Sequence, residues 1–283
     1  MRRAPVIVIG MHRSGTSMVT RVLEELGLFM GWRKERNDEA WFFHRLNKWL
    51  LAQGGGSWEC PGAIRHVLGA ADVRGRVMEY LEMMMSSPRA ASYMGIGRYV
   101  RLGSVMKMEG VWGWKDPRNT FTLPLWLELF PGGRVINVVR HGVDVAESLR
   151  ARHELGYARL ARRMEVLRPV LRWVMVERPL LPSGRCKTLE GGFTLWEEYM
   201  REARGHVEAL GERAIEIKYE DFLGAPEEPV RRLCRFCGLE PGEERVVAAV
   251  RGIKRERAYA YREKPELVAY AEEVKGRLGE WGY

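Results

Sequence analysis

The chain has 283 residues, of which 46% are hydrophobic and 29% are charged, a composition typical of a globular protein with a sizeable core. Its net charge of +9 favours an anionic ligand, but neither zinc-finger spacing nor an aromatic-interleaved RNA motif accompanies it, so no nucleic-acid partner is expected. Four cysteines do not indicate a disulfide scaffold, and the absence of a long apolar run indicates no membrane anchor.

The first predicted elements are a short strand and a glycine-bearing loop. Residues 6–9 form a β-branched run typical of a central parallel strand. Residues 10–17 have the glycine spacing of a Walker A phosphate loop, but Thr16 stands where that motif has its lysine. Such a loop can still hold one phosphate through backbone N–H groups, with Arg13 supplying positive charge. A helix is expected from about Thr16 to Gly27.

Three later segments also carry polar side chains directly after a predicted strand. They are 110–118 with Lys115, 133–149 with Arg140 and Ser148, and 215–223 with Tyr219. Ligands of open parallel α/β sheets bind outside the carboxyl ends of the strands. We therefore expect all four segments at one sheet edge. The fold class predicted is α/β, a three-layer P-loop-containing nucleotide-binding fold with a central, mostly parallel sheet.

Hydrophobic periodicity predicts further helices at 38–53, 72–86, 120–130, 142–152, 156–177, 192–210, 227–238 and 265–279. Residues 179–184 are a turn-rich break. We interpret the region around 155–210 as a helical insertion in a single domain that spans 1–283. Cys234 and Cys237 lie on one face of the predicted 227–238 helix, which favours core packing over a metal site.

The phosphate loop, Gly-Met-His-Arg-Ser-Gly-Thr-Ser, resembles the 5′-phosphosulfate loop of sulfotransferases that use 3′-phosphoadenosine 5′-phosphosulfate (PAPS). The bacterial and tyrosylprotein branches of that family are the most similar. Arg140 and Ser148 resemble the family's 3′-phosphate site, and a guanidinium with a hydroxyl is chemically suited to grip a phosphate. The Lys-Asp-Pro stretch that begins at Lys115 resembles another family segment. Tyr219 resembles the tyrosine that lies near the adenine.

The resemblance runs from about residue 5 to about residue 240 and implies transfer of a sulfuryl group from PAPS to a hydroxyl or amine, with 3′-phosphoadenosine 5′-phosphate (PAP) as product. Lys115 is implied to stabilise the departing phosphate, and no metal is implied because there is no triphosphate to bridge. The residues implied to hold the 5′-phosphosulfate are His12, Arg13, Ser14, Gly15, Thr16 and Ser17.

The catalytic base implied by the resemblance is a glutamate shortly after the first helix. Glu39 is best placed, with Glu35 and Asp38 in the same segment. We expect Glu39 to open the 38–53 helix, where capping and the helix dipole would equally explain an acidic residue. His44, one turn further on, is a substitute base.

The acceptor stays open among a small molecule, a carbohydrate and a peptide, and so does the oligomeric state. Eukaryotic Golgi members of the family carry a membrane anchor, so a cytoplasmic, prokaryotic protein is expected. One alternative is a P-loop kinase or NTPase with Asp116 as a Walker B acid, against which the missing lysine counts. The other is a non-catalytic nucleotide- or nucleic-acid-binding protein.

Overall fold

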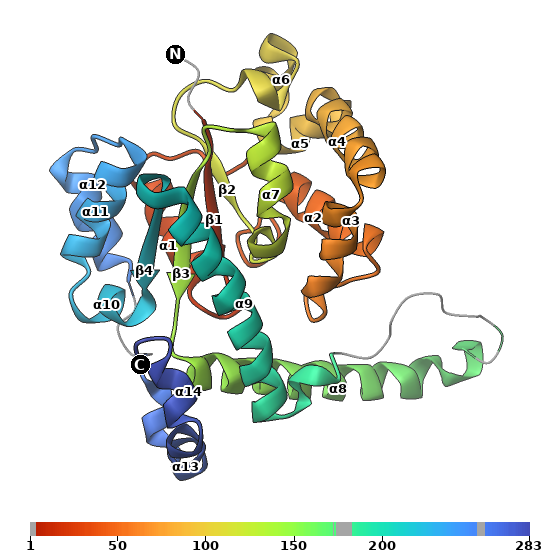
Figure 1. The fold of residues 1–283 in the computed structure, drawn as a ribbon, viewed down its shortest axis with the longest axis vertical. Helices are drawn as coiled ribbons and strands as arrows, with labels where there is room; N and C mark the ends of the chain where they lie inside the picture. The colour runs from red at the N-terminus through yellow and green to blue at the C-terminus, as the bar shows by residue number, and fades with distance from the viewer. Residues whose placement is uncertain (1–3, 172, 174–182, 254–257) are drawn as a thin grey trace. The chain divides into compact units, whose positions relative to one another are not determined.

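The computed structural model describes residues 4–171, 173, 183–253 and 258–283, which fall into two compact units (Figure 1). The first unit comprises Met1–Arg140 and Tyr199–Ala258, and the second comprises His141–Glu198 and Tyr259–Tyr283. That the whole chain acts as one domain with an insertion stays a prediction.

A parallel sheet of four strands lies at the centre of the first unit, in the order β2-β1-β3-β4. The strands are β1 (Val6–Gly10), β2 (Gly113–Lys115), β3 (Arg134–Val139) and β4 (Ala214–Lys218). In the register, Val8 lies opposite both Lys115 and Ile136. Because every pair is parallel, the carboxyl ends of all four strands meet at one edge, as predicted.

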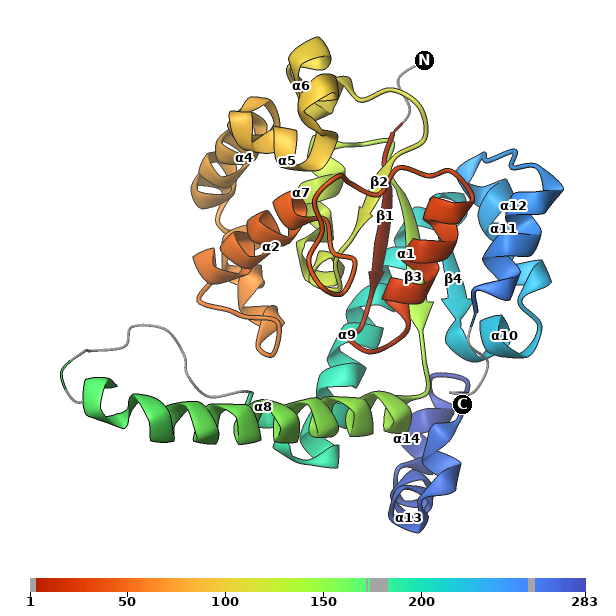
Figure 2. The ribbon, with the colours of Figure 1, turned by 180° about the vertical axis from the view of Figure 1, so that it is seen from behind.

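Helices cover both faces of this sheet, which confirms the predicted three-layer α/β fold (Figures 1 and 2). α7 (Asn119–Leu129) packs on one face. The elements on the other face are α1 (Thr16–Glu25), α10 (Tyr219–Gly224), α11 (Glu227–Cys237) and α12 (Glu243–Arg251). β1 is therefore buried along its whole length, which explains its unbroken β-branched run.

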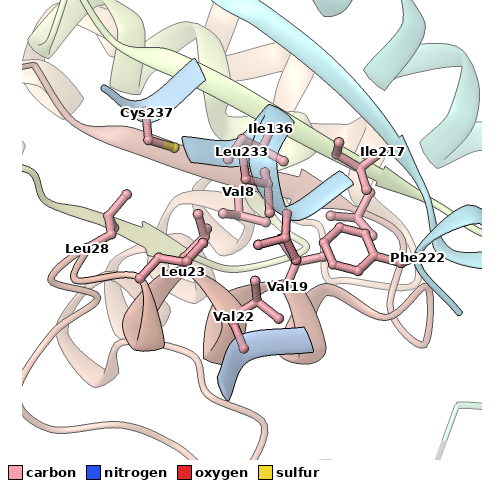
Figure 3. Packing of buried hydrophobic residues seen from close by; sticks show 14 of the residues in the cluster. Val8, Val19, Val22, Leu23, Leu28, Ile136, Ile217, Phe222, Leu233 and Cys237 are labelled. Atoms are coloured by element: carbon pink, nitrogen blue, oxygen red, sulfur yellow. The ribbon is translucent and has the colours of Figure 1, made fainter. Parts of the chain in front are cut away.

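The hydrophobic core on the α1 side is built from alternate strand residues (Figure 3). Val8, Ile136 and Ile217 come from three neighbouring strands and meet the apolar face of α1. Since strand side chains alternate between faces, one register places them all on the same side. Cys234 and Cys237 are buried in this core, as predicted. β1 and α1 both pack into this core, so the phosphate loop that joins them is held at both of its ends.

The remaining helices of the first unit are α2 (Trp41–Gln53), α3 (Arg65–Gly69), α4 (Ala71–Ser86), α5 (Ala91–Met94) and α6 (Ile96–Leu102). The second unit contains α8 (Gly142–Leu171), α13 (Pro265–Glu273) and α14 (Lys275–Gly279). α9 (Leu189–Leu210) begins in the second unit and ends in the first. Every helix among the described residues is too short or too polar to span a lipid bilayer.

The number of predicted helices was wrong in two regions of the second unit. The predicted helices 142–152 and 156–177 are one continuous helix, α8, because an alanine-, leucine- and arginine-rich sequence tolerates the single Gly156. The predicted helix 265–279 is instead two helices that meet at Val274. Residues 172 and 174–177 of the second predicted helix, and 179–182 of the predicted break, lie outside the described residues.

Candidate active site

The phosphate loop joins β1 to α1, and its two glycines are required by geometry. Gly10 and Gly15 have φ of 127° and 92°, where a side chain is strained. An added Cβ would also overlap the Val138 carbonyl at Gly10 and the Tyr219 ring at Gly15. The glycine spacing read from the sequence therefore reflects close approach of β3 and of Tyr219 to the loop.

The N-terminus of α1 presents an environment suited to an anion. Gly15 is its N-cap and supplies no side-chain hydrogen bond, and the first turn, which includes Thr16 and Ser17, has no acidic residue. Helix N-termini carry partial positive charge and open N–H groups. The Ser14 hydroxyl is only 1% exposed and has no hydrogen-bond partner among the described residues. A phosphate oxygen would satisfy it, so these residues fit the 5′-phosphosulfate implied by the resemblance.

Arg140 lies at the end of β3, beside the phosphate loop. Its Nη1 donates to the Arg13 carbonyl at 3.3 Å, and its guanidinium lies 4.7 Å from the centroid of the Tyr219 ring. Arg13 itself has an exposed side chain and a left-handed backbone, with φ of 73°. Ser148 lies on α8 in the second unit and is half-buried, so its predicted pairing with Arg140 stays a prediction.

A buried ion pair joins Glu39 to Lys115, the last residue of β2. The Lys115 Nζ lies 2.8 Å from Glu39 Oε1, and the two residues are 1% and 3% exposed respectively. The ammonium also donates to the Asn37 carbonyl and, at 3.3 Å, to the Ser17 hydroxyl. Ser17 in turn donates to Asn37 O at 2.7 Å. Lys115, the expected electrostatic stabiliser, therefore contacts the phosphate loop directly, and Glu39, the expected base, is joined to the loop through Lys115.

The expectation that Glu39 opens a helix was wrong. α2 begins at Trp41, with Ala40 as its N-cap and no acidic residue in its first turn. The chain turns just before Glu39 because Asp38 has a left-handed φ of 63° and its carboxylate pairs with Arg21 at 2.9 Å. Capping therefore does not explain Glu39, whose carboxylate instead neutralises a buried lysine.

His44 belongs to a second cluster of polar side chains, together with Asp116 and Arg118. The Arg118 Nη1 donates to Asp116 Oδ1 at 3.0 Å, and His44 Nδ1 lies 3.6 Å from Asp116 Oδ2. Burial opposes the charged form of Asp116, but the Arg118 guanidinium and His44 outweigh it and hold the pKa of Asp116 well below its usual range. Asp116 thus remains a carboxylate and can orient the imidazole of His44.

A sulfotransferase family model matches residues 5–243 of the sequence. This chain belongs to the sulfotransferase family. Among solved structures it is similar to the sulfotransferase domain from the curacin biosynthetic pathway, with a TM-score of 0.49 and 16% identity over 97% of this chain and 99% of that one. It is also similar to sulfotransferase STF9 from Mycobacterium avium, with a TM-score of 0.46 and 14% identity over 97% of this chain and 76% of that one. No curated protein matches the sequence.

Sequence reasoning missed several residues of this sulfotransferase that contact the predicted site. His12 packs edge-on against Trp58, with ring centroids 4.9 Å apart, and Tyr199 lies 6.2 Å away. The Tyr199 hydroxyl donates to the Trp58 carbonyl at 2.8 Å. Arg118 directly follows the Lys-Asp-Pro stretch, but no sequence pattern assigned it a role. Tyr199 lies within an ordinary helix and has no local sequence signal.

No group of His, Cys, Asp and Glu side chains in the described ranges is arranged to hold a metal ion. The predicted metal independence of this sulfotransferase nevertheless stays a prediction.

Proposed function

We propose that this sulfotransferase uses PAPS as its donor and transfers the sulfuryl group to a hydroxyl or amine of a small molecule, carbohydrate or peptide. The observation that carries the proposal is the Glu39–Lys115 pair, held against Ser17 of a phosphate loop that lacks the Walker lysine. A base and a cation beside a single-phosphate site are what sulfuryl transfer requires.

The donor is expected to bind along the carboxyl edge of the sheet. The first-turn N–H groups of α1 and the Ser14 hydroxyl would hold the 5′-phosphate, with Arg13 nearby. Arg140 would grip the 3′-phosphate. The adenine would enter a cavity of about 570 Å³ that Tyr219 lines together with residues of α1 and α12. A cavity of this volume accommodates a nucleobase.

PAPS supplies a sulfuryl group whose bond to the 5′-phosphate oxygen breaks as the acceptor oxygen or nitrogen bonds to sulfur. Lys115 would donate to that phosphate oxygen and stabilise its growing charge. Glu39 would accept the acceptor's proton. Because the two side chains are paired with each other, Lys115 must exchange Glu39 for the phosphate, and this exchange leaves the carboxylate available as the base.

His44 is the second candidate for the base. Asp116 and Arg118 contact the Nδ1 atom of its imidazole, so the Nε2 atom would be the one that accepts a proton. The same contacts argue against a kinase, since Asp116 is fully buried and ion-paired with Arg118 instead of being available as a Walker B ligand.

The test is calorimetric titration with PAP, AMP and ATP, with and without Mg²⁺. Preferential, metal-independent binding of PAP is expected, and preference for Mg·ATP would refute the proposal. In assays with PAPS, Glu39→Gln is expected to abolish turnover and preserve PAP binding. Glu35→Gln, in the same segment, is the matched control and should stay active. If the Glu39→Gln variant were fully active, the catalytic base would be His44 instead of Glu39.

A further inference from the structure

A cavity of about 520 Å³ lies between α2 and α4 in the first unit. Five residues of one face of α2 line it, together with two from α4 and one from the short 3₁₀ helix Pro88–Ala90 that follows. They are Trp41, Phe42, Arg45, Leu46, Trp49, Tyr80, Met84 and Arg89. The volume falls in the range of small-molecule sites.

The cavity is on a different face of α2 from the candidate active site. Its α2 residues recur at helical spacing along one stripe, starting from Trp41. His44 and Asn47 fall outside this stripe. On their side of the helix, His44 approaches Asp116, and Asn47 donates to Asn119 at 2.7 Å. The cavity is therefore separate from the residues proposed to transfer the sulfuryl group.

The walls of the cavity are aromatic and its floor is apolar. The rings of Trp49 and Tyr80 lie 4.2 Å apart at 32°, and both residues are half-buried. Phe42, Leu46 and Met84 are buried beneath them. A flat, apolar ring system would replace water here with stacking and dispersion contacts.

Three arginines surround this aromatic surface. The guanidinium carbons of Arg33 and Arg45 lie 4.5 and 5.5 Å from the centroid of the Trp41 ring, and Arg89 lines the cavity. All three are exposed, and within the described ranges none of them has a carboxylate partner, unlike Arg74 and Arg76 on the neighbouring helix. The positive charge at the cavity is thus available to an anion.

We propose that this cavity binds a planar organic anion, an aromatic ring system that carries one carboxylate or sulfate group. The ring packs against Trp41 and Trp49, and the anionic group pairs with Arg45 and Arg89. Guanidinium suits this role because it offers paired donors to planar or tetrahedral oxyanions. The site does not depend on PAPS being the donor.

The experiment is calorimetric titration of the full chain, without donor, using 2-naphthoate, 2-naphthyl sulfate and the neutral 2-naphthamide. Both anions are expected to bind at least tenfold more tightly than the amide. If only the sulfate ester binds, the ligand belongs to the product class of phenol sulfation. If both anions bind equally, the site takes aromatic anions in general.

Substitutions in the cavity test whether the naphthyl anions bind there. Arg45→Gln combined with Arg89→Gln should weaken binding of the anions at least tenfold. Arg76→Gln is the matched control, because Arg76 is an exposed arginine of α4 that is paired with Glu79 outside the cavity. Since the substituted side chains are exposed, circular dichroism should show an unchanged fold. Equal affinity for the amide, or anion binding unaffected by the double variant, would overturn the proposal.

Discussion

The Glu39–Lys115 pair leads to a quantitative prediction about stability. Glu39→Leu leaves the Lys115 ammonium 1% exposed with only the Asn37 carbonyl and the Ser17 hydroxyl as partners. Removing one member of a buried pair typically costs about 3–5 kcal/mol. With a urea m-value of about 3 kcal/mol per M, the unfolding midpoint should fall by about 1–2 M.

The double variant Glu39→Leu, Lys115→Met should recover most of this loss, to within about 2 kcal/mol of the wild type, because replacing both charges by apolar groups is often neutral. The Asn37 carbonyl still accepts from Ser17 in that variant. Urea unfolding followed by circular dichroism measures Glu39→Leu, Lys115→Met and the double variant. Glu79→Gln is the control, because its partner Arg76 has a side chain that is 82% exposed and such pairs contribute less than about 1 kcal/mol. The reasoning would be refuted if Glu39→Leu lowered the free energy of unfolding by less than about 1 kcal/mol. It would also be refuted if the double variant lost as much as the two single variants together.

Three further predictions concern the phosphate sites and the Asp116 ion pair. Gly15→Ala forces a side chain into a left-handed backbone and against the Tyr219 ring, so affinity for PAP should fall at least tenfold in calorimetry; unchanged affinity would contradict the close packing. Arg140→Ala should weaken PAP binding by about 1.5–3 kcal/mol and barely change AMP binding, and equal losses would remove the 3′-phosphate assignment. The lowered pKa of Asp116 means that its pairing with Arg118 stabilises the fold above the unfolded pKa of about 3.9 and is lost as the pH falls towards the lower folded value. The stability difference between wild type and Asp116→Asn, from urea unfolding, should therefore shrink as the pH falls below about 4; a difference that grew as the pH fell below about 4 would be inconsistent with this ion pair.

The sequence alone determined the parts of this protein whose causes are local. Glycine spacing, β-branched runs and helical periodicity predicted β1, the phosphate loop and α1, because backbone sterics and strand burial act over a few residues. The rule that ligands bind at the carboxyl edge then placed Lys115, Arg140 and Tyr219 together, because parallel strands share one direction.

Which side chains pair with each other follows from the packing of the whole fold. Lys115 pairs with Glu39, 76 residues earlier, and not with its neighbour Asp116, because a buried ammonium takes whichever carboxylate the packing brings to it. Packing likewise brings His44 to Asp116 and Tyr199 to Trp58. These contacts join distant segments whose approach depends on the whole arrangement of helices around the sheet, and no local pattern encodes that arrangement.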